Sequence, residues 1–367
     1  MKVPFNYLTF QFKNTKSYFA SWKKLIKSTN FTLGPYVKKF ENDLAKFVKT
    51  KYCISTNNGT DALIISLKSL GIKKNDEVIT VANTFYATVG AIVACGAKPV
   101  FVDCDKRYQI NVNKIQKAIT KKTKVILPVH WGGASPDMKK ILMIAKKNKL
   151  KVLEDACMGI GGKIHNKSPG NFGNIAAMSM HPLKSLNVMG DGGMIVTNDK
   201  KLASWISQYR NHGMKNRDEI DFWGINARIQ PLQAVVACIE LKKIKKILKK
   251  RNQNANFLDR ELRNIKGVTI PYREKDNFET HALYMGLFKK RDKLKKFLIK
   301  KGIEVKIHYP IPLHLQKAAR DLRYKKGDFP VAEYQAKHLL TLPVHQYLNK
   351  KQLKNIVQNI KQFYKTK

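Results

Sequence analysis

The decisive stretch of the chain is Ser179-Met-His-Pro-Leu-Lys184-Ser-Leu-Asn-Val-Met-Gly190-Asp-Gly-Gly193. Lys184 stands there among small and apolar residues, whereas the other lysines of the chain stand mostly in charged runs. The glycines that follow it indicate a backbone folded tightly against a ligand. Most lysines of a protein belong on its surface, but this setting makes Lys184 the first candidate for a functional side chain.

Two motifs upstream of Lys184 fit one chemistry. The run Val152-Leu-Glu154-Asp155-Ala156 predicts an apolar strand that ends on a carboxylate. The run Ser55-Thr-Asn-Asn58-Gly59-Thr60-Asp61-Ala62 predicts a small-residue turn that opens a helix, and the N–H groups and dipole of a helix start suit a phosphate. A phosphate cradle, a strand-end aspartate and an isolated lysine, in that order, are what an enzyme dependent on pyridoxal 5′-phosphate (PLP) needs.

The composition sets the general class of the protein. With 367 residues the chain can bury a sizeable core, and its length fits one large and one smaller domain. A hydrophobic content of 43% and a charged content of 26% are typical of a globular protein. The sequence predicts neither a signal peptide nor a membrane span. Its five cysteines show no CxxC pair and no metal-ligand spacing, so we expect buried free thiols, no metal and a cytoplasmic enzyme.

The net charge of +44 is unusual and is typical of partners such as nucleic acid or an anionic membrane. Only 11 of the 70 basic residues are arginine, however, and nucleic-acid readers use arginine heavily. The lysines recur on nearly every predicted helix. In residues 241–250, for example, the apolar positions 241, 244, 247 and 248 make one buried and one wet face. We therefore predict a solvated surface, with no specific nucleic acid and no membrane as partner.

Between Cys53 and about Val196, short strands rich in Val and Ile alternate with helical stretches. The predicted strands are residues 77–81, 99–102, 124–129, 150–153 and 193–197. This alternation predicts an α/β fold with a mostly parallel central sheet covered by helices. Ligands of such sheets collect at the carboxyl ends of the strands, so Asp155, Phe85 and the turn at Gly59 are expected to converge.

The flanking segments predict a second unit. Helices are expected over Ser17–Ser28 and about Val37–Val48, with Gly34-Pro35 as the turn before the latter. A long helix from about Pro231 to Leu262 leads to a C-terminal unit. That unit has predicted strands at 282–288 and 304–307 with a helix over 291–301 between them. We expect residues 1–245 to form the N-terminal region and large PLP-binding domain, and residues 246–367 a small α+β domain.

These motifs resemble the DegT/StrS-type sugar aminotransferases, which belong to the fold type I PLP enzymes. The resemblance spans nearly the whole chain, in the family's order and at about its spacings. The blocks that carry it are Phe31-Thr-Leu-Gly34-Pro35, Asn58-Gly59-Thr60-Asp61-Ala62-Leu63, Asn83-Thr84-Phe85, Glu154-Asp155-Ala156, Ser179 to Gly193, Gly224-Ile-Asn226-Ala-Arg228 and His308-Tyr-Pro-Ile-Pro-Leu-His314-Leu-Gln316.

The resemblance implies roles for three residues around the cofactor ring. Lys184 would form the Schiff base with PLP and shuttle the proton, which a lysine amine does once its pKa is held down. Asp155 would face the pyridine nitrogen and keep it protonated. Phe85 resembles the aromatic residue that stacks on the ring, although an aromatic residue after a strand is more often part of the core.

The resemblance also implies a phosphate site shared between two subunits. Gly59, Thr60, Asp61 and Ser179 resemble the family's phosphate-binding residues. Asn226 resembles the asparagine that reaches the phosphate from the partner subunit, which implies a homodimer with shared active sites.

The sequence departs from the family at two positions. Met158 stands where the family commonly has a glutamine that binds the ring hydroxyl, and a thioether cannot donate that bond. Ser185 follows the lysine where asparagine is common. The family's sugar dehydratases replace the lysine with histidine, so the retained Lys184 favours transamination.

Further residues in the motif blocks are candidates for the substrate. These are Arg228, His308, Tyr309 and His314. For His130, His308 and His314, structural and sugar-contacting roles both remain open, and the absence of a Cys or carboxylate cluster around them argues against a metal.

The resemblance implies a transaminase that moves an amino group from glutamate to a keto sugar nucleotide, through pyridoxamine 5′-phosphate (PMP), for amino-sugar and polysaccharide biosynthesis. The loop from Lys184 to Gly193 has the length found in many members that aminate at C3. Two alternatives remain. One is an aminotransferase acting on a cyclitol or another non-nucleotide ketone, and the other is a basic regulatory or nucleic-acid-binding protein that has kept the fold.

Overall fold

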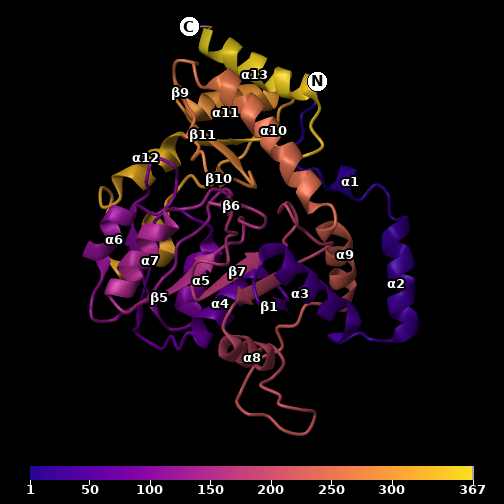
Figure 1. Ribbon diagram of the computed structural model, residues 1–367. Helices are drawn as coiled ribbons and strands as arrows, with labels where there is room; N and C mark the ends of the chain where they lie inside the picture. The colour runs from indigo at the N-terminus through magenta and orange to yellow at the C-terminus, as the bar shows by residue number, and fades with distance from the viewer. Residues whose placement is uncertain (366–367) are drawn as a thin grey trace.

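The computed structural model describes residues 1–365, and a seven-stranded sheet forms its centre (Figure 1). Its strands are β1 (Tyr52–Thr56), β2 (Glu77–Val81), β3 (Lys98–Val102), β4 (Thr123–Ile126), β5 (Lys151–Asp155), β7 (Ile175–Ser179) and β8 (Gly193–Thr197). They lie in the order β1-β8-β7-β5-β4-β2-β3, and only β8 runs antiparallel to its neighbours. The predicted α/β fold with a mostly parallel sheet is confirmed.

Helices bury both faces of this sheet. They are α3 (Gly34–Val48), α4 (Gly59–Ser69), α5 (Tyr86–Ala94), α6 (Val112–Ala118), α7 (Met138–Lys147), α8 (Lys200–Tyr209) and α9 (Pro231–Leu241). Successive strand residues point to opposite sides. Ala177 of β7 packs in the apolar cluster that contains α4, whereas its neighbour Ala176 packs in the cluster of α3 and α9. This double burial explains why the strands are almost wholly apolar.

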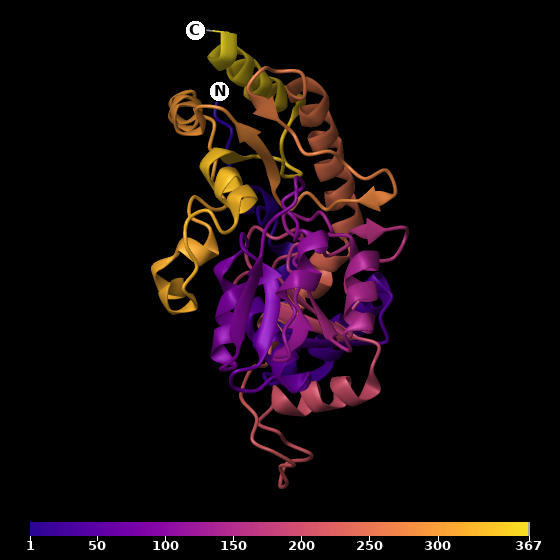
Figure 2. The same ribbon diagram turned by 90° about the vertical axis from the view of Figure 1, so that its left-hand side faces the viewer.

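A smaller C-terminal unit lies at one end of the large one (Figures 1 and 2). Its sheet has the order β12-β11-β9. Its elements are α10 (Ile244–Leu262), β9 (Val268–Thr269), β11 (Tyr284–Phe288), α11 (Arg291–Lys300), the 3-10 turns Leu313–Leu315 and Lys317–Leu322, α12 (Pro330–His338), β12 (Leu339–Leu342) and α13 (Lys350–Lys365). The short strands β6 (Lys163–Ile164) and β10 (Asn277–Phe278) pair between the units. A domain boundary at residue 245 stays a prediction.

The N-terminal segment joins both units. It contains α1 (Leu8–Gln11) and α2 (Lys16–Ser28). Val3 packs in the apolar cluster of the C-terminal unit, with Leu258 of α10, whereas Tyr18 of α2 packs in the cluster of α3 and α9. The chain therefore starts in the small unit and crosses to the large one within a few turns.

Several element boundaries differ from the sequence predictions. Strands β1 and β7 were not predicted, and β7 has two alanines at its centre and Ile175 as its single β-branched residue. Gly34-Pro35 opens helix α3 instead of preceding it, because proline suits the first turn of a helix. Residues 304–307 form no strand and make only the bridge from Lys306 to Thr341 at the outer edge of β12.

The long helix predicted over 231–262 is two helices, α9 and α10, which meet at Lys242-Lys243. The apolar positions 241, 244, 247 and 248 are all buried, as their spacing predicts. The break coincides with a change of surroundings, because α9 packs with α3 in the large unit and Ala255 of α10 packs in the small unit.

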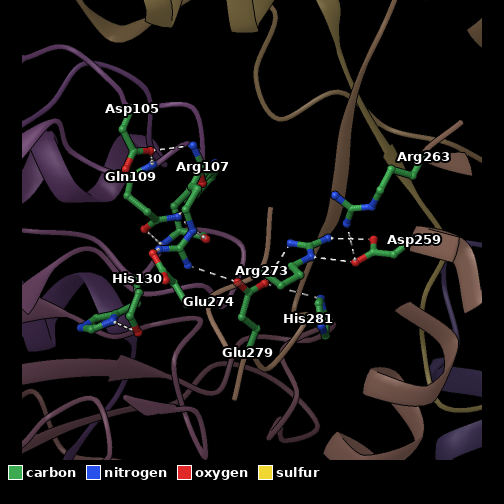
Figure 3. Close-up of polar contacts among 12 residues, drawn as sticks. Asp105, Arg107, Gln109, His130, Asp259, Arg263, Arg273, Glu274, Glu279 and His281 are labelled. Atoms are coloured by element: carbon green, nitrogen blue, oxygen red, sulfur yellow. Dashed lines mark hydrogen bonds and ion pairs between the residues drawn. The ribbon is translucent and has the colours of Figure 1, made fainter. Parts of the chain in front are cut away.

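A chain of ion pairs connects the two units (Figure 3). Arg107, which follows β3, lies 3.2 Å from Glu279, and the other oxygen of Glu279 accepts from Arg273 at 2.9 Å. Arg273 also donates two hydrogen bonds to Asp259 of α10, at 3.0 and 3.2 Å. These partly buried contacts hold the segment after Glu279 against the large unit. Among the described residues, no helix is long and apolar enough to cross a membrane.

Candidate active site

A cavity of about 250 Å³ opens at the carboxyl ends of the central strands, where the two units meet. Most residues that the sequence predicted for a site contribute to its wall. They are Gly59, Thr60, Phe85, Asp155, Met158, Ser179, Lys184, His308 and Tyr309. The parallel sheet brings these distant segments together, as expected for ligands of this fold.

Lys184 reaches this cavity from a tight turn after β7. Its N–H donates to the carbonyl of His181 at 3.0 Å, and Leu183 before it has a φ of +74°, in the left-handed region. Removal from water lowers the pKa of Lys184, although Cys157 and the Asp155 carboxylate act in the opposite direction. A lowered pKa raises the fraction of neutral amine, which is the nucleophilic form of a lysine.

Asp155 ends strand β5 and is almost fully buried. One carboxylate oxygen accepts from Thr88 Oγ1 at 2.8 Å, and the other accepts from the N–H of Cys157 at 3.2 Å. Thr88 lies on α5, directly beyond β2. Two neighbouring strand ends therefore fix this carboxylate in the cavity wall, where it can pair with a protonated ring nitrogen.

The preceding residue, Glu154, points away from the cavity into a buried network. It accepts from His130 Nε2 at 2.9 Å and from the N–H groups of Gly170, Phe172 and Gly173. Burial would raise the pKa of Glu154, but these hydrogen bonds prevail and hold it below its ordinary value. His130 is bonded on its other side to Ser135 and does not line the cavity, so its place in the molecule is structural.

The start of α4 forms a tight cradle with Ser179. A Cβ added to Gly59 would lie 2.7 Å from Cβ of Ser179, so only glycine allows this approach. The side chain of Asn58 caps the helix by accepting from the N–H of Asp61 at 2.8 Å. Asp61 itself bonds back to Asn58 and lies outside the cavity wall. The structure therefore places Asp61 in the helix cap and not, as expected, against a ligand.

An aromatic wall borders the mouth of the cavity. Phe85 precedes α5, and its ring centroid lies 5.4 Å from that of Tyr86 and 6.1 Å from that of Tyr309. Tyr309 also lies 5.9 Å from Trp131. Phe85 is 44% exposed, which is unusual for a core residue and suits stacking on a ligand ring. Its stacking role remains a prediction.

Besides Asp61, three predicted residues do not line the cavity of this chain. His314 is buried, with Nε2 3.1 Å from Glu333, so its expected contact with substrate is not supported by its position. Asn226 and Arg228 lie on the segment between α8 and α9, part of which projects from the large unit (Figure 1). Asn226 itself forms a bridge with Asn211, close to the end of α8. Arg228 donates to the side chain of Asn211 at 2.9 Å, and Asn226 is exposed.

The sequence analysis missed several residues of the cavity wall, among them Tyr7, Arg251 and His345. The burial of Arg251 could have been predicted from the sequence, because Arg251 continues the buried face that Ile244 and Leu248 form on the same helix. Burial lowers the pKa of both His308 and His345 to about 4, so both imidazoles are neutral near pH 7. The cavity thus combines neutral histidines with the guanidinium of Arg251 and with Lys184, whose pKa is lowered.

The fold and this arrangement of lysine, strand-end aspartate and glycine cradle define a PLP-dependent transaminase of fold type I. The chain belongs to the DegT/DnrJ/EryC1/StrS aminotransferase family, whose family model matches residues 13–361. The predictions of family, enzyme class and cofactor are thereby confirmed.

Two curated relatives cover nearly the same length. A protein of Geobacillus stearothermophilus named pleiotropic regulatory protein is 38% identical over 100% of this chain and 99% of its own. The UDP-2-acetamido-2-deoxy-3-oxo-D-glucuronate aminotransferase of Pseudomonas aeruginosa is 36% identical over 92% of this chain and 93% of its own.

Solved structures agree with the fold and with the cofactor. Streptomyces venezuelae DesV, solved with a ketimine intermediate, is 30% identical and superimposes with a TM-score of 0.97 over 100% of this chain and 99% of that one. NtdA of Bacillus subtilis, solved with bound PMP, is 30% identical with a TM-score of 0.92 over 100% of this chain and 86% of that one.

The depressed pKa of Lys184 predicts a stability cost in the cofactor-free protein. Folding favours the neutral amine while the unfolded chain keeps it protonated, so the cost is greatest at low pH and vanishes toward the ordinary pKa of 10.5. Lys184→Met should therefore raise the free energy of unfolding. This gain should shrink, by up to about 1.4 kcal/mol per pH unit, as the pH rises toward that value.

Urea unfolding of the cofactor-free proteins between pH 7 and pH 10 measures this difference. Lys201→Met, at an exposed position in α8, is the matched control and should show no such pH dependence. An equal, pH-independent shift in both variants would contradict the assignment of a desolvated amine at position 184.

Proposed function

We propose that this protein transfers the amino group of glutamate to the 3-keto group of a nucleotide-linked sugar, with PLP held by Lys184 in a cytoplasmic homodimer. The observation that carries the proposal is the approach of a desolvated lysine amine and a buried strand-end carboxylate in one cavity. Five free cysteines fit a reducing compartment.

Each proposed role follows from a local contact. PLP supplies an electron sink for carbanion charge at the substrate carbon. Asp155, fixed by Thr88, would hold a proton on the ring nitrogen. Lys184 would take and return the proton at that carbon, which its lowered pKa favours. Gly59, Thr60 and Ser179 would bind the phosphate, since they form the cradle at the start of α4.

The acceptor is inferred from charge and from the relatives. The Pseudomonas aeruginosa enzyme is named for a 3-oxo sugar attached to UDP. The net charge of +44 would favour a doubly anionic nucleotide diphosphate. His308 and Tyr309 line the cavity and would contact the sugar. An aminotransferase acting on a cyclitol or another free ketone is the alternative within the same chemistry.

A second candidate function is a basic regulatory protein that has kept the fold. The name of the Geobacillus stearothermophilus relative and the large positive charge favour it. Cofactor trapping separates the two candidates, because a protein with a purely regulatory role needs no covalently attached cofactor.

The first test is attachment of the cofactor. The purified protein should absorb visible light, and borohydride should fix the cofactor to the peptide that contains Lys184. Lys184→Ala should abolish both signals, whereas Lys201→Ala, at an exposed position, should leave them unchanged. Asp155→Ala should retain some cofactor and lose about a hundredfold in transamination, because the ring loses its charge partner. Labelling at another lysine would refute the assignment.

The second test is the position of amination. Nucleotide-linked 3-keto and 4-keto sugars, and a free 3-keto sugar, are assayed side by side with glutamate as donor. We expect the nucleotide-linked 3-keto sugar to react fastest. A preference for the 4-keto compound would overturn the C3 proposal, and a preference for the free sugar would favour the non-nucleotide alternative. Either result would leave the transaminase proposal standing.

The third test concerns a shared site. Asn226 is exposed and outside the chain's own cavity, beside Trp223, which is 87% exposed, so a partner subunit would explain both. Lys184→Ala and Asn226→Ala proteins, each weak alone, should regain up to roughly a quarter of wild-type activity after random subunit exchange, since each hybrid dimer has one intact site.

Lys184→Ala mixed with Asp155→Ala is the control for this exchange. Both residues lie in the cavity of one chain, so no hybrid site would be intact and no activity should return. If proven exchange between the Lys184→Ala and Asn226→Ala proteins restores nothing, Asn226 does not serve the partner's site.

A further inference from the structure

The main-chain carbonyl of Lys184 is held by two side chains from different parts of the molecule. Tyr7 donates its hydroxyl proton to this oxygen at 2.9 Å. Asn187 donates from its side-chain amide to the same oxygen, also at 2.9 Å. Neither contact reaches the amine of Lys184, so both act on the backbone that carries it.

The direction of the hydrogen bond from Tyr7 is fixed by a third residue. Arg251 of α10 donates to the Tyr7 hydroxyl at 2.8 Å, and a guanidinium has no acceptor. The proton of Tyr7 must therefore point to the Lys184 carbonyl. Both Tyr7 and Arg251 are buried, and burial raises the pKa of Tyr7, so the hydroxyl keeps the proton that it donates.

The second donor is anchored through the same N-terminal segment. The Asn187 amide also donates to Gln11 at 3.0 Å, and Gln11 in turn donates to Glu240 of α9 at 2.7 Å. Tyr7 precedes α1 and Gln11 ends it. The short helix α1 thus places both supports of the Lys184 carbonyl at once.

The turn that carries Lys184 needs such support. Leu183 has a φ of +74°, which a γ-branched L-residue adopts rarely, and such backbone persists only where the surroundings fix it. The amine lies at the end of a flexible four-carbon stem, so a rotation of the backbone at the Lys184 Cα would swing it across the cavity. The hydrogen bonds at the carbonyl fix the 184–185 peptide on one side of this Cα and oppose that rotation.

We propose that Tyr7 is a positioning residue for Lys184: its hydroxyl, oriented by Arg251, fixes the main-chain carbonyl of Lys184 and thereby directs the amine into the cavity. Asn187 gives partly redundant support to the same atom. This inference rests on the proposed role of Lys184, but its test measures the reactivity of the Lys184 amine in the protein without any cofactor.

The experiment compares wild type, Tyr7→Phe, Asn187→Ala and the double variant as cofactor-free proteins. Each is treated with acetic anhydride over a range of pH, and the labelling rate of the peptide that contains Lys184 is measured by mass spectrometry. Tyr347→Phe is the matched control, since its ring stacks on Tyr7 at 6.0 Å while its hydroxyl makes no bond to Lys184. Thermal unfolding and circular dichroism verify that every variant is folded.

We expect the pH profile of Lys184 labelling to shift toward that of an ordinary lysine in Tyr7→Phe, because the amine no longer stays in the desolvated cavity. Near neutral pH, each single variant should reduce the labelling rate of Lys184 by some factor. The double variant should reduce it by about tenfold more than the two factors multiplied together, since the carbonyl then has neither donor. In the cofactor-loaded proteins, the visible absorbance should show a matching change in its pH titration.

Two outcomes would overturn the proposal. One is a folded Tyr7→Phe protein with the wild-type labelling profile. The other is an equal shift in Tyr347→Phe, which would indicate a general loosening of the N-terminal segment. If Tyr7→Phe does not fold, Asn187→Ala tests the same carbonyl from its other side. Failure of the wild type to bind PLP would instead refute the proposed function, and the labelling comparison would still decide the role of Tyr7.

Discussion

The structure depends on one constraint. The amine of Lys184 is kept out of water at the carboxyl end of the central sheet, beside the buried carboxylate of Asp155. Desolvation lowers the pKa of Lys184, and the nearby Asp155 prevents the cost of burial from becoming larger. The strand ends, the helix α4 and the C-terminal unit all meet at this point. Folding therefore places an ionisable amine and a carboxylate in one cavity at a cost in stability, and binding of a ligand there compensates part of that cost.

The acidic residues of the chain explain much of its surface charge. There are only 26 acids against 70 basic residues, and several of these acids are buried. Glu154 holds a loop, Glu240 holds the N-terminal segment, and Asp259 and Glu279 hold the two units together. Since these carboxylates serve as internal contacts, most of the lysine excess has no acidic partner on the surface. The resulting positive field attracts anionic ligands over distances near the Debye length.

The sequence was sufficient for the fold class and for part of the cavity wall, because both depend on local patterns. A Val- and Leu-containing strand that ends on a carboxylate indicated Asp155, whereas Gly59 and Lys184 were indicated by the small and glycine-rich residues around them. Strand β7 was missed because its centre, Ala176-Ala177, consists of alanines, whose burial depends on neighbouring strands. The sequence did not predict Tyr7 and Arg251 as cavity residues. Their contact joins residues 244 positions apart, and no spacing in one sequence encodes such a pair. Asp61 and His314 have polar partners within the chain that their motifs do not reveal, namely a helix cap and a buried ion pair. Their roles toward a ligand stay predictions.

The N-terminal segment couples the two units to the lysine. Within its first 18 residues the chain packs Val3 in the small unit, places Tyr7 on the Lys184 carbonyl and packs Tyr18 in the large unit. Arg251 makes the same connection from the other side, because α10 begins in the large unit and ends in the small one. A displacement of the small unit would therefore act on Tyr7 both through the N-terminal segment and through Arg251, and Tyr7 passes it to the Lys184 carbonyl by its hydrogen bond. Since that carbonyl belongs to the residue that carries the amine, the relative position of the units and the direction of Lys184 are set by the same hydrogen bonds.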